Sequence, residues 1–217
     1  MSSTGSHNKI INAAARMALK PAGAIRKGQS RLWLDDNGWY ITLIEFQPSS
    51  SPGSLLNIGV QFMWYPKDAY AFDAGYRQQD IGSIRYRNDD QFTPQAQAMA
   101  EAARDRMLVI RQQMQGITSA STYIHGLLAE NPVTVWTYLH QGMLHLLQGH
   151  TDEALSRFRQ LLAEPDSWEW ALAVKTHTQE LMLHIQHQRH LPWLTEIVQQ
   201  SRALKKLPER VIDLSTI

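Results

Sequence analysis

The sequence predicts an α+β protein, in which an antiparallel β-sheet of four to five strands, flanked by helices, precedes an all-helical C-terminal half. Strand-forming segments separated by short turns run from about Arg31 to Arg87. From Ser119 onward, every segment has the spacing of a helix. Because short loops join antiparallel neighbours and the helices follow the strands, the pattern is typical of the α+β class.

The composition is that of a globular protein, with 43% hydrophobic and 19% charged residues. The formal net charge is +1, with acidic and basic residues interspersed. No basic stripe emerges, so we expect no nucleic-acid partner. The sequence contains no cysteine, which excludes disulfides, thiolate metal sites and cysteine nucleophiles.

The N-terminal segment MSSTGSHNK is polar and lacks the apolar core of a signal peptide. The longest apolar run, around Leu55 to Tyr65, is too short and too polar to cross a membrane. We therefore expect a cytoplasmic protein without a membrane partner, whose residues 1–6 are disordered.

A first helix is predicted from His7 to Lys20, because apolar residues recur there at helical spacing and Pro21 and Gly23 follow. Asn37-Gly38 then predicts a hairpin with a type I′ turn, since these residue types adopt positive φ.

Centring this hairpin on Asn37-Gly38 places Leu34 opposite Ile41, and the same alternation assigns the two faces of the sheet. One face is apolar throughout: Tyr40, Ile44, Phe46, Leu56, Ile58, Val60, Phe62 and Trp64. The other is divided between an apolar part (Leu32, Leu34, Trp39, Ile41, Leu43) and a polar part (Glu45, Gln47, Asn57, Gln61). We expect helices to cover the first face fully and the second in part.

A polar stripe on the divided face is the first candidate site. If Tyr65 pairs with Ala69, then Asn57 lies opposite Arg77, which can reach over it to Glu45. The whole stripe comprises Glu45, Gln47, Asn57, Gln61, Asp73 and Arg77. It is either the floor of a binding pocket or a satisfied polar network where the helical half docks on the sheet.

The next helix is predicted to begin with Thr93 as N-cap and Pro94 in its first turn, and to run to about Met114. Five further helices are predicted, at 119–129, 133–148, 151–164, 168–187 and 192–205. Asn131-Pro132, Gly149 and Glu164-Pro165 separate them. Two domains follow: a sheet domain over 7–115 and a helical hairpin stack over 119–207, packed on or beside it.

The stretch from about 133 to 165 contains LHQGMLHLLQGHTDEALSRFRQLLAEP, which resembles one tetratricopeptide repeat. Small residues at Gly142 and Ala154 would let paired helices approach closely, while Phe158 fills the seam. The closing Pro165 is one position early for that repeat.

Residues 7 to about 115 resemble a family of uncharacterised bacterial proteins whose domain has no assigned function. The resemblance rests on RLWLDDNGWY, EFQPSS, Asn57-x-Gly59 and FDAGYR at Phe72 to Arg77. It implies a helix before an antiparallel sheet and another helix after it. Related small α/β domains occur in bacterial toxin-neutralising gene sets, so an immunity role is a hypothesis by analogy.

Four histidines cluster late in the chain: His177, His184, His187 and His190. Glu180, His184 and His187 share one helical face at a spacing that can hold a metal ion, but no second helix offers a matching pair. We interpret them as surface or seam side chains, and expect neither a metal nor another cofactor.

Signatures of catalysis are missing from the sequence, which has no phosphate-binding glycine loop, no GxSxG and no HExxH. Ser49–Ser51 has no accompanying histidine and is interpreted as a plain loop. We therefore name no catalytic residue.

Trp168 and Trp170 are two positions apart and cannot share a helix face. One is expected to be packed and the other partly exposed as a protein contact. The hypothesis is a non-enzymatic interaction module whose partner is another protein. The alternative is a small-molecule-binding protein or enzyme that uses Glu45, Asp73 and Arg77 in a cleft.

Overall fold

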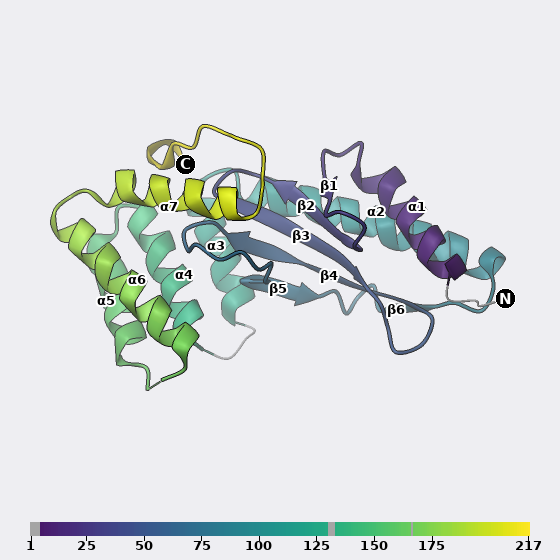
Figure 1. Cartoon of the computed structure of the whole chain (residues 1–217), viewed down its shortest axis with the longest axis horizontal. Coiled ribbons are helices and arrows are strands. Elements are labelled where there is room, and N and C mark those ends of the chain that lie inside the picture. Colours follow the sequence, from purple (N-terminus) through teal and green to yellow (C-terminus); the bar gives the residue numbers. More distant parts are fainter. Residues whose placement is uncertain (1–4, 130–132, 166) are drawn as a thin grey trace. The chain divides into compact units, whose positions relative to one another are not determined.

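The computed structural model describes residues 5–129, 133–165 and 167–217 (Figure 1). In this part of the chain, one helix, six strands and then six helices follow one another, which confirms the α+β class. No helix of the described ranges is long and apolar enough to cross a membrane. Disorder was predicted for residues 1–6, but Ser6 already begins a helix. Residues 1–4 and the predicted break at Asn131-Pro132 lie outside the described residues.

The chain forms two units that differ from a simple division into halves. The first contains the residues up to Gln61 and Tyr70–Gln112. The second contains Phe62–Ala69 and Gln113–Ile217. A short segment from the strand region therefore belongs to the helical unit.

The sheet has six strands in the order β1-β2-β3-β4-β5, with β6 beside the start of β4. Their bounds are β1 Ile25–Arg26, β2 Leu32–Asp36, β3 Tyr40–Gln47, β4 Gly53–Phe62, β5 Ala74–Arg77 and β6 Ser83–Arg85. The pairs β1·β2, β2·β3, β4·β5 and β4·β6 are antiparallel. The strand predicted at 69–77 is shorter than expected, and β1 is too short to leave a pattern in the sequence.

Two helices complete the first unit: α1 (Ser6–Leu19) and α2 (Asp89–Gln113). They lie side by side at one point, where the rings of His7 and Phe92 meet edge-on at 6.4 Å. In the view of Figure 1, α2 runs behind the sheet.

α2 begins at Asp89, four residues before the predicted N-cap Thr93. Asn88 Oδ1 accepts a hydrogen bond of 2.9 Å from the Gln91 N–H, which is the contact that an N-cap makes. The Thr93 hydroxyl instead donates to the Asp89 carbonyl, and Pro94 lies inside the helix. The prediction was wrong because two cap-forming residues compete here and the earlier one starts the helix.

The predicted hairpin is present, but its turn lies one residue later. Leu34 pairs with Leu43, not with Ile41, so the predicted register is wrong by two residues. Gly38 has a φ of 89°, whereas Asn37 does not have positive φ. A single positive φ at the first central position is the pattern of a type II′ turn. Because the shift is even, every side chain stays on its predicted face.

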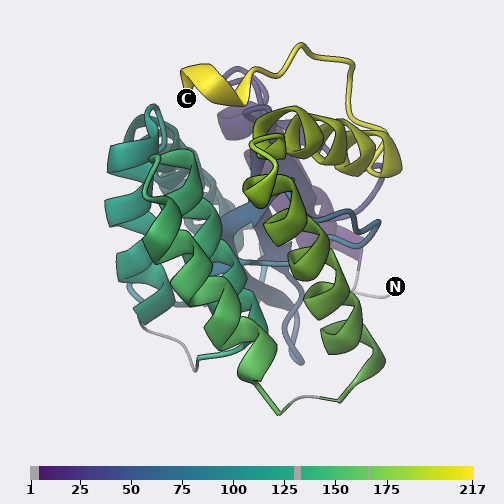
Figure 2. The ribbon, with the colours of Figure 1, turned by 90° about the vertical axis from the view of Figure 1, so that its left-hand side faces the viewer.

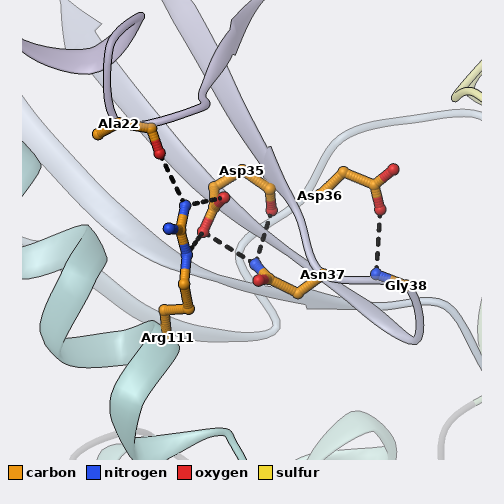
Figure 3. A network of polar contacts seen from close by, with 6 residues as sticks. All are labelled: Ala22, Asp35, Asp36, Asn37, Gly38 and Arg111. Atoms are coloured by element: carbon orange, nitrogen blue, oxygen red, sulfur yellow. Dashed lines mark hydrogen bonds and ion pairs between the residues drawn. The ribbon is translucent and has the colours of Figure 1, made fainter.

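Side-chain hydrogen bonds explain the shift of the turn (Figure 3). Asp36 Oδ1 accepts from the Gly38 N–H at 3.0 Å, which is the contact of an Asx-turn. Asn37 Nδ2 donates to the Asp35 carbonyl at 3.0 Å and to Asp35 Oδ2 at 2.9 Å. Asn37 is thus held to the end of β2, and Gly38 takes the left-handed conformation.

The carboxylate of Asp35 is almost completely buried and needs a countercharge. Arg111, in the last turn of α2, donates from Nη2 to Asp35 Oδ1 at 2.6 Å and to the Ala22 carbonyl at 3.0 Å (Figure 3). The hydrogen bond with Asp35 raises the pKa of Arg111 above its ordinary value. One guanidinium therefore joins α2, the segment after α1 and the hairpin.

The helices of the second unit are α3 Ile117–Ala129, α4 Val135–Leu147, α5 Thr151–Ala163, α6 Glu169–Gln186 and α7 His190–Leu204, followed by a 3₁₀ turn at Leu214–Thr216. Each lies within two residues of its predicted bounds. α4 and α5 form a helical hairpin (Figure 2).

The α4–α5 seam depends on a glycine. A Cβ built on Gly142 would lie 2.3 Å from Phe158 Cε1, so the phenylalanine ring occupies the space of a side chain. Phe158 and Ala154 are both fully buried, as the repeat-like pattern predicts.

Replacing Gly38 with Val should destabilise the protein by more than about 1 kcal/mol, because a β-branched residue is strained at positive φ. Urea unfolding measures the change. Gly38→Asn should cost less than Gly38→Val, since Asn tolerates positive φ better. Equal stabilities for all three proteins would contradict the turn assignment.

Replacing Gly142 with Ala should lower the free energy of unfolding by about 1–3 kcal/mol, because the methyl group overfills the seam. Gly126→Ala is the matched control. Gly126 also lies in a helix, nothing lies within 4 Å of its Cβ position, and Ala there should stabilise by up to about 1 kcal/mol. A loss of stability in both variants would argue against the seam.

Candidate functional site

The polar stripe forms a hydrogen-bonded cluster within the first unit. Asn57 Nδ2 donates to Glu45 Oε2 at 2.7 Å and to Gln47 Oε1 at 3.1 Å. Arg77 Nη2 donates to the same Gln47 oxygen at 2.6 Å. Arg77 was expected to reach Glu45, but Gln47 takes its place, because one amide oxygen lies within reach of both donors.

The predicted register of the strands beneath this cluster is correct. Asn57 lies opposite Arg77, and Gly59 lies opposite Gly75. A Cβ on Gly59 would lie 2.4 Å from the Ala74 carbonyl oxygen, so this strand pair needs glycine. The Asn57-x-Gly59 and FDAGYR motifs are therefore cross-strand neighbours.

The remaining residues of the stripe lie at its end. Gln61 is fully buried and Asp73 is half-buried. The backbone N–H of Asp73 donates to the Val60 carbonyl, which extends the ladder by one residue before the start of β5. Gln61 and Asn57 are more buried than the expected partial cover of this face implies.

Inside the second unit, the segment Phe62–Ala69 lies among the helices. Phe62, Met63 and Trp64 are each at most 1% exposed. The Trp64 indole stacks on the Phe62 ring at 4.0 Å and donates its N–H to His140 Nδ1 at 3.0 Å. Two large aromatic side chains of this segment thus form part of the helical core.

Polar side chains hold the backbone of the same segment. His177 Nε2 lies 3.0 Å from the Trp64 carbonyl oxygen. Lys205 Nζ donates to the carbonyls of Lys67 and Ala69, the latter at 2.9 Å. Residues of α4, α6 and the end of α7 therefore bind the segment as they would bind a peptide.

Aromatic rings continue from this core to the surface. Trp136 of α4 meets Tyr65 edge-on at 5.0 Å and carries the Lys67 ammonium over its face at 4.6 Å. Trp170 is parallel to Trp136, with ring centroids 6.2 Å apart. Trp168 precedes the first turn of α6 and contacts neither ring in these pairs.

Trp168 precedes α6, and Trp170 and Leu172, two positions apart in its first turns, project to different sides of the helix. We call these three exposed apolar side chains around the start of α6 the tryptophan surface. They are 68%, 46% and 51% exposed, respectively. The expectation that one of the two tryptophans would be packed is wrong, because both are exposed, although Trp170 lies parallel to Trp136. Such exposure of large apolar side chains at one helix end is typical of a protein contact.

Two of the four late histidines, His177 and His184, pack against an aromatic ring. His184 stacks on Trp193 at 5.0 Å, and His177 contacts the same ring at 5.0 Å. Over the described ranges, no group of three or more His, Asp or Glu residues is arranged to hold a metal ion.

Sequence reasoning missed the transfer of Phe62–Ala69 to the helical unit. The apolar alternation of β4 continues through Phe62 and Trp64, so the pattern predicts more sheet. The Trp64-Tyr65-Pro66-Lys67 sequence, in which proline ends a strand, was the available signal.

Comparisons of the chain with protein-family models, curated proteins and solved structures find no match. The fold itself therefore defines the class, which is α+β. The resemblances at 7–115 and 133–165 stay predictions.

Lowering the pH should destabilise the protein through His177. Burial holds the pKa of His177 below its ordinary value of 6.5, against smaller opposing effects of the Trp64 carbonyl and Glu180. Below that pH the unfolded chain takes up a proton that the folded protein resists, so the free energy of unfolding falls. Urea unfolding at about pH 7.5 and about pH 5 measures this loss.

His177→Gln should reduce the loss of stability between the two pH values, because no proton is then taken up at this position. His187→Gln, at an exposed position, is the control and should leave the pH dependence as it is. An unchanged loss in His177→Gln would assign the pH dependence to other groups.

Proposed function

We propose that the protein is a non-enzymatic interaction module, whose partner is a protein segment bound at the tryptophan surface. The observation that carries the proposal is the exposure of Trp168, Trp170 and Leu172 at one end of α6. Tryptophan is the residue type most enriched where truncation weakens binding strongly.

The charge around this surface selects the chemistry of the partner. From Arg159 to Lys175 the sequence contains Glu164, Asp166 and Glu169 between the two basic end residues, so acidic residues outnumber basic ones by three to two. A basic partner is therefore favoured over an acidic one.

A contact of the proposed kind, between a cation and an indole ring, already exists within the second unit. Lys67 lies over the face of Trp136, next to the parallel Trp170 ring. A cation over an indole is a favourable pair, and an exposed indole offers a free face for another. The partner segment thus carries Lys or Arg beside an aromatic or aliphatic residue. A bacterial toxin domain with such a segment would fit the immunity hypothesis.

Peptide selection tests this proposal. A phage-displayed random library is selected on the wild-type protein and depleted on the folded Trp168→Ala/Trp170→Ala double variant. The enriched peptides should contain Lys or Arg next to an apolar residue. Their affinity for the double variant should be at least about tenfold lower, since central tryptophans contribute about 2 kcal/mol or more.

Two control variants separate the surfaces. Val211→Ala removes another apolar side chain, which is 94% exposed, and should leave peptide affinity unchanged. Arg77→Ala alters the polar cluster of the first unit and should also leave it unchanged. Peptides that are acidic, or that bind the double variant equally, would contradict the proposal.

A small-molecule site at the polar cluster is the second candidate function. Asn57 Oδ1 and Arg77 Nε are buried, and neither has a hydrogen-bond partner among the described residues. A polar ligand could satisfy both atoms. If so, Arg77→Ala rather than the tryptophan variant would abolish binding in a screen of small polar compounds.

A further inference from the structure

A basic hollow lies in the first unit, beyond the surfaces described above. It has a volume of about 370 Å³ and is lined by Ser83, Arg85, Arg87, Gln91 and Gln95. Arg85 is the last residue of β6, and Arg87 lies at the bend between β6 and α2; both line the hollow. The lining contains no carboxylate.

The backbone of both arginines is held in place by one glutamine. Gln91 Nε2 donates to the Arg85 carbonyl at 3.2 Å, and Gln91 Oε1 accepts from the Arg87 N–H at 3.1 Å. The same Nε2 donates to Gln95 Oε1 at 2.7 Å. The Gln91 carboxamide thus pairs with backbone groups along the outer edge of the strand and holds the backbone of Arg85 and Arg87 beside the hollow.

Neither guanidinium is neutralised within the described part of the chain. The side chains of Arg85 and Arg87 make no ion pair or hydrogen bond there, whereas Arg106 pairs with Asp80. Asp89, which follows closely in sequence, accepts hydrogen bonds from Ser6 and Tyr86 instead. Two positive charges therefore face the hollow uncompensated.

We propose that this hollow binds a phosphate monoester. Such a group carries about −1.5 to −2 charges at neutral pH and three acceptor oxygens, which match two guanidiniums. The Ser83 hydroxyl is a further donor. A carboxylate, with one charge and two oxygens, would leave one arginine uncompensated. The hollow is larger than a phosphate group, so the carrier is accommodated as well.

Isothermal titration at low ionic strength tests this assignment. The probes are inorganic phosphate, a capped phosphoserine peptide and acetate. Phosphate and the phosphopeptide should bind saturably and acetate should not. Arg85→Gln and Arg87→Gln should each weaken binding about tenfold or more, in line with the loss of a charge-assisted hydrogen bond. Thermal unfolding verifies that each variant is folded.

Arg16→Gln is the matched control, because Arg16 is an exposed arginine of α1. It should leave binding unchanged, as should Trp168→Ala, so this result is independent of the tryptophan surface. Tighter binding of the phosphopeptide than of inorganic phosphate assigns the group to a protein side chain, and equal binding assigns it to a free phosphate compound. Acetate binding of equal strength, an equal loss in Arg16→Gln, or no saturable binding would overturn the proposal.

Discussion

The burial of Trp64 is the constraint on which the second unit depends. Its indole N–H is out of reach of water and needs an acceptor, which His140 Nδ1 provides. Its carbonyl oxygen needs a donor, which His177 provides. Both histidines therefore have a structural role, and the acceptor role of His140 requires Nδ1 to be unprotonated. His177, one of the four late histidines of the sequence, thus serves together with His140 to satisfy the polar groups of one inserted tryptophan.

In the first unit, too, a buried polar group needs a partner, but the group is the carboxylate of Asp35 and not an indole. Asp35 is buried, so the chain must bring a cation to it, and Arg111 from the end of α2 does so. Because this guanidinium also binds the Ala22 carbonyl, one buried carboxylate positions three segments that are far apart in the sequence. Removing either partner would leave the other uncompensated, so the pair determines where α2 ends on the sheet.

Local patterns predicted the elements. The β4·β5 register was correct although the short loop assumed for it is absent, since the long segment Met63–Asp73 joins the two strands. The predicted β2·β3 register was wrong. The choice between the two turn types depended on hydrogen bonds made by the Asp36 and Asn37 side chains, and the alternation of apolar residues contains no information about these bonds. The cluster of Glu45, Asn57 and Arg77 was predicted from pairing alone. The hydrogen bonds through which Gln47 joins Asn57 and Arg77 were not predicted, because they depend on whether its amide oxygen lies within reach of both side chains.

The tryptophans Trp64, Trp170 and Trp168 of the second unit differ in exposure, which separates the buried one, on which stability depends, from the two for which we propose a partner contact. Trp64 is 1% exposed, Trp170 46% and Trp168 68%. Truncating Trp64 would open a cavity and leave His140 without its donor, so that loss of binding could not be told from loss of fold. The outer rings have water on one side already, and their truncation costs little packing. A protein with no role for these two rings would gain solubility by replacing them, and that cost is the physical argument for the partner contact proposed above.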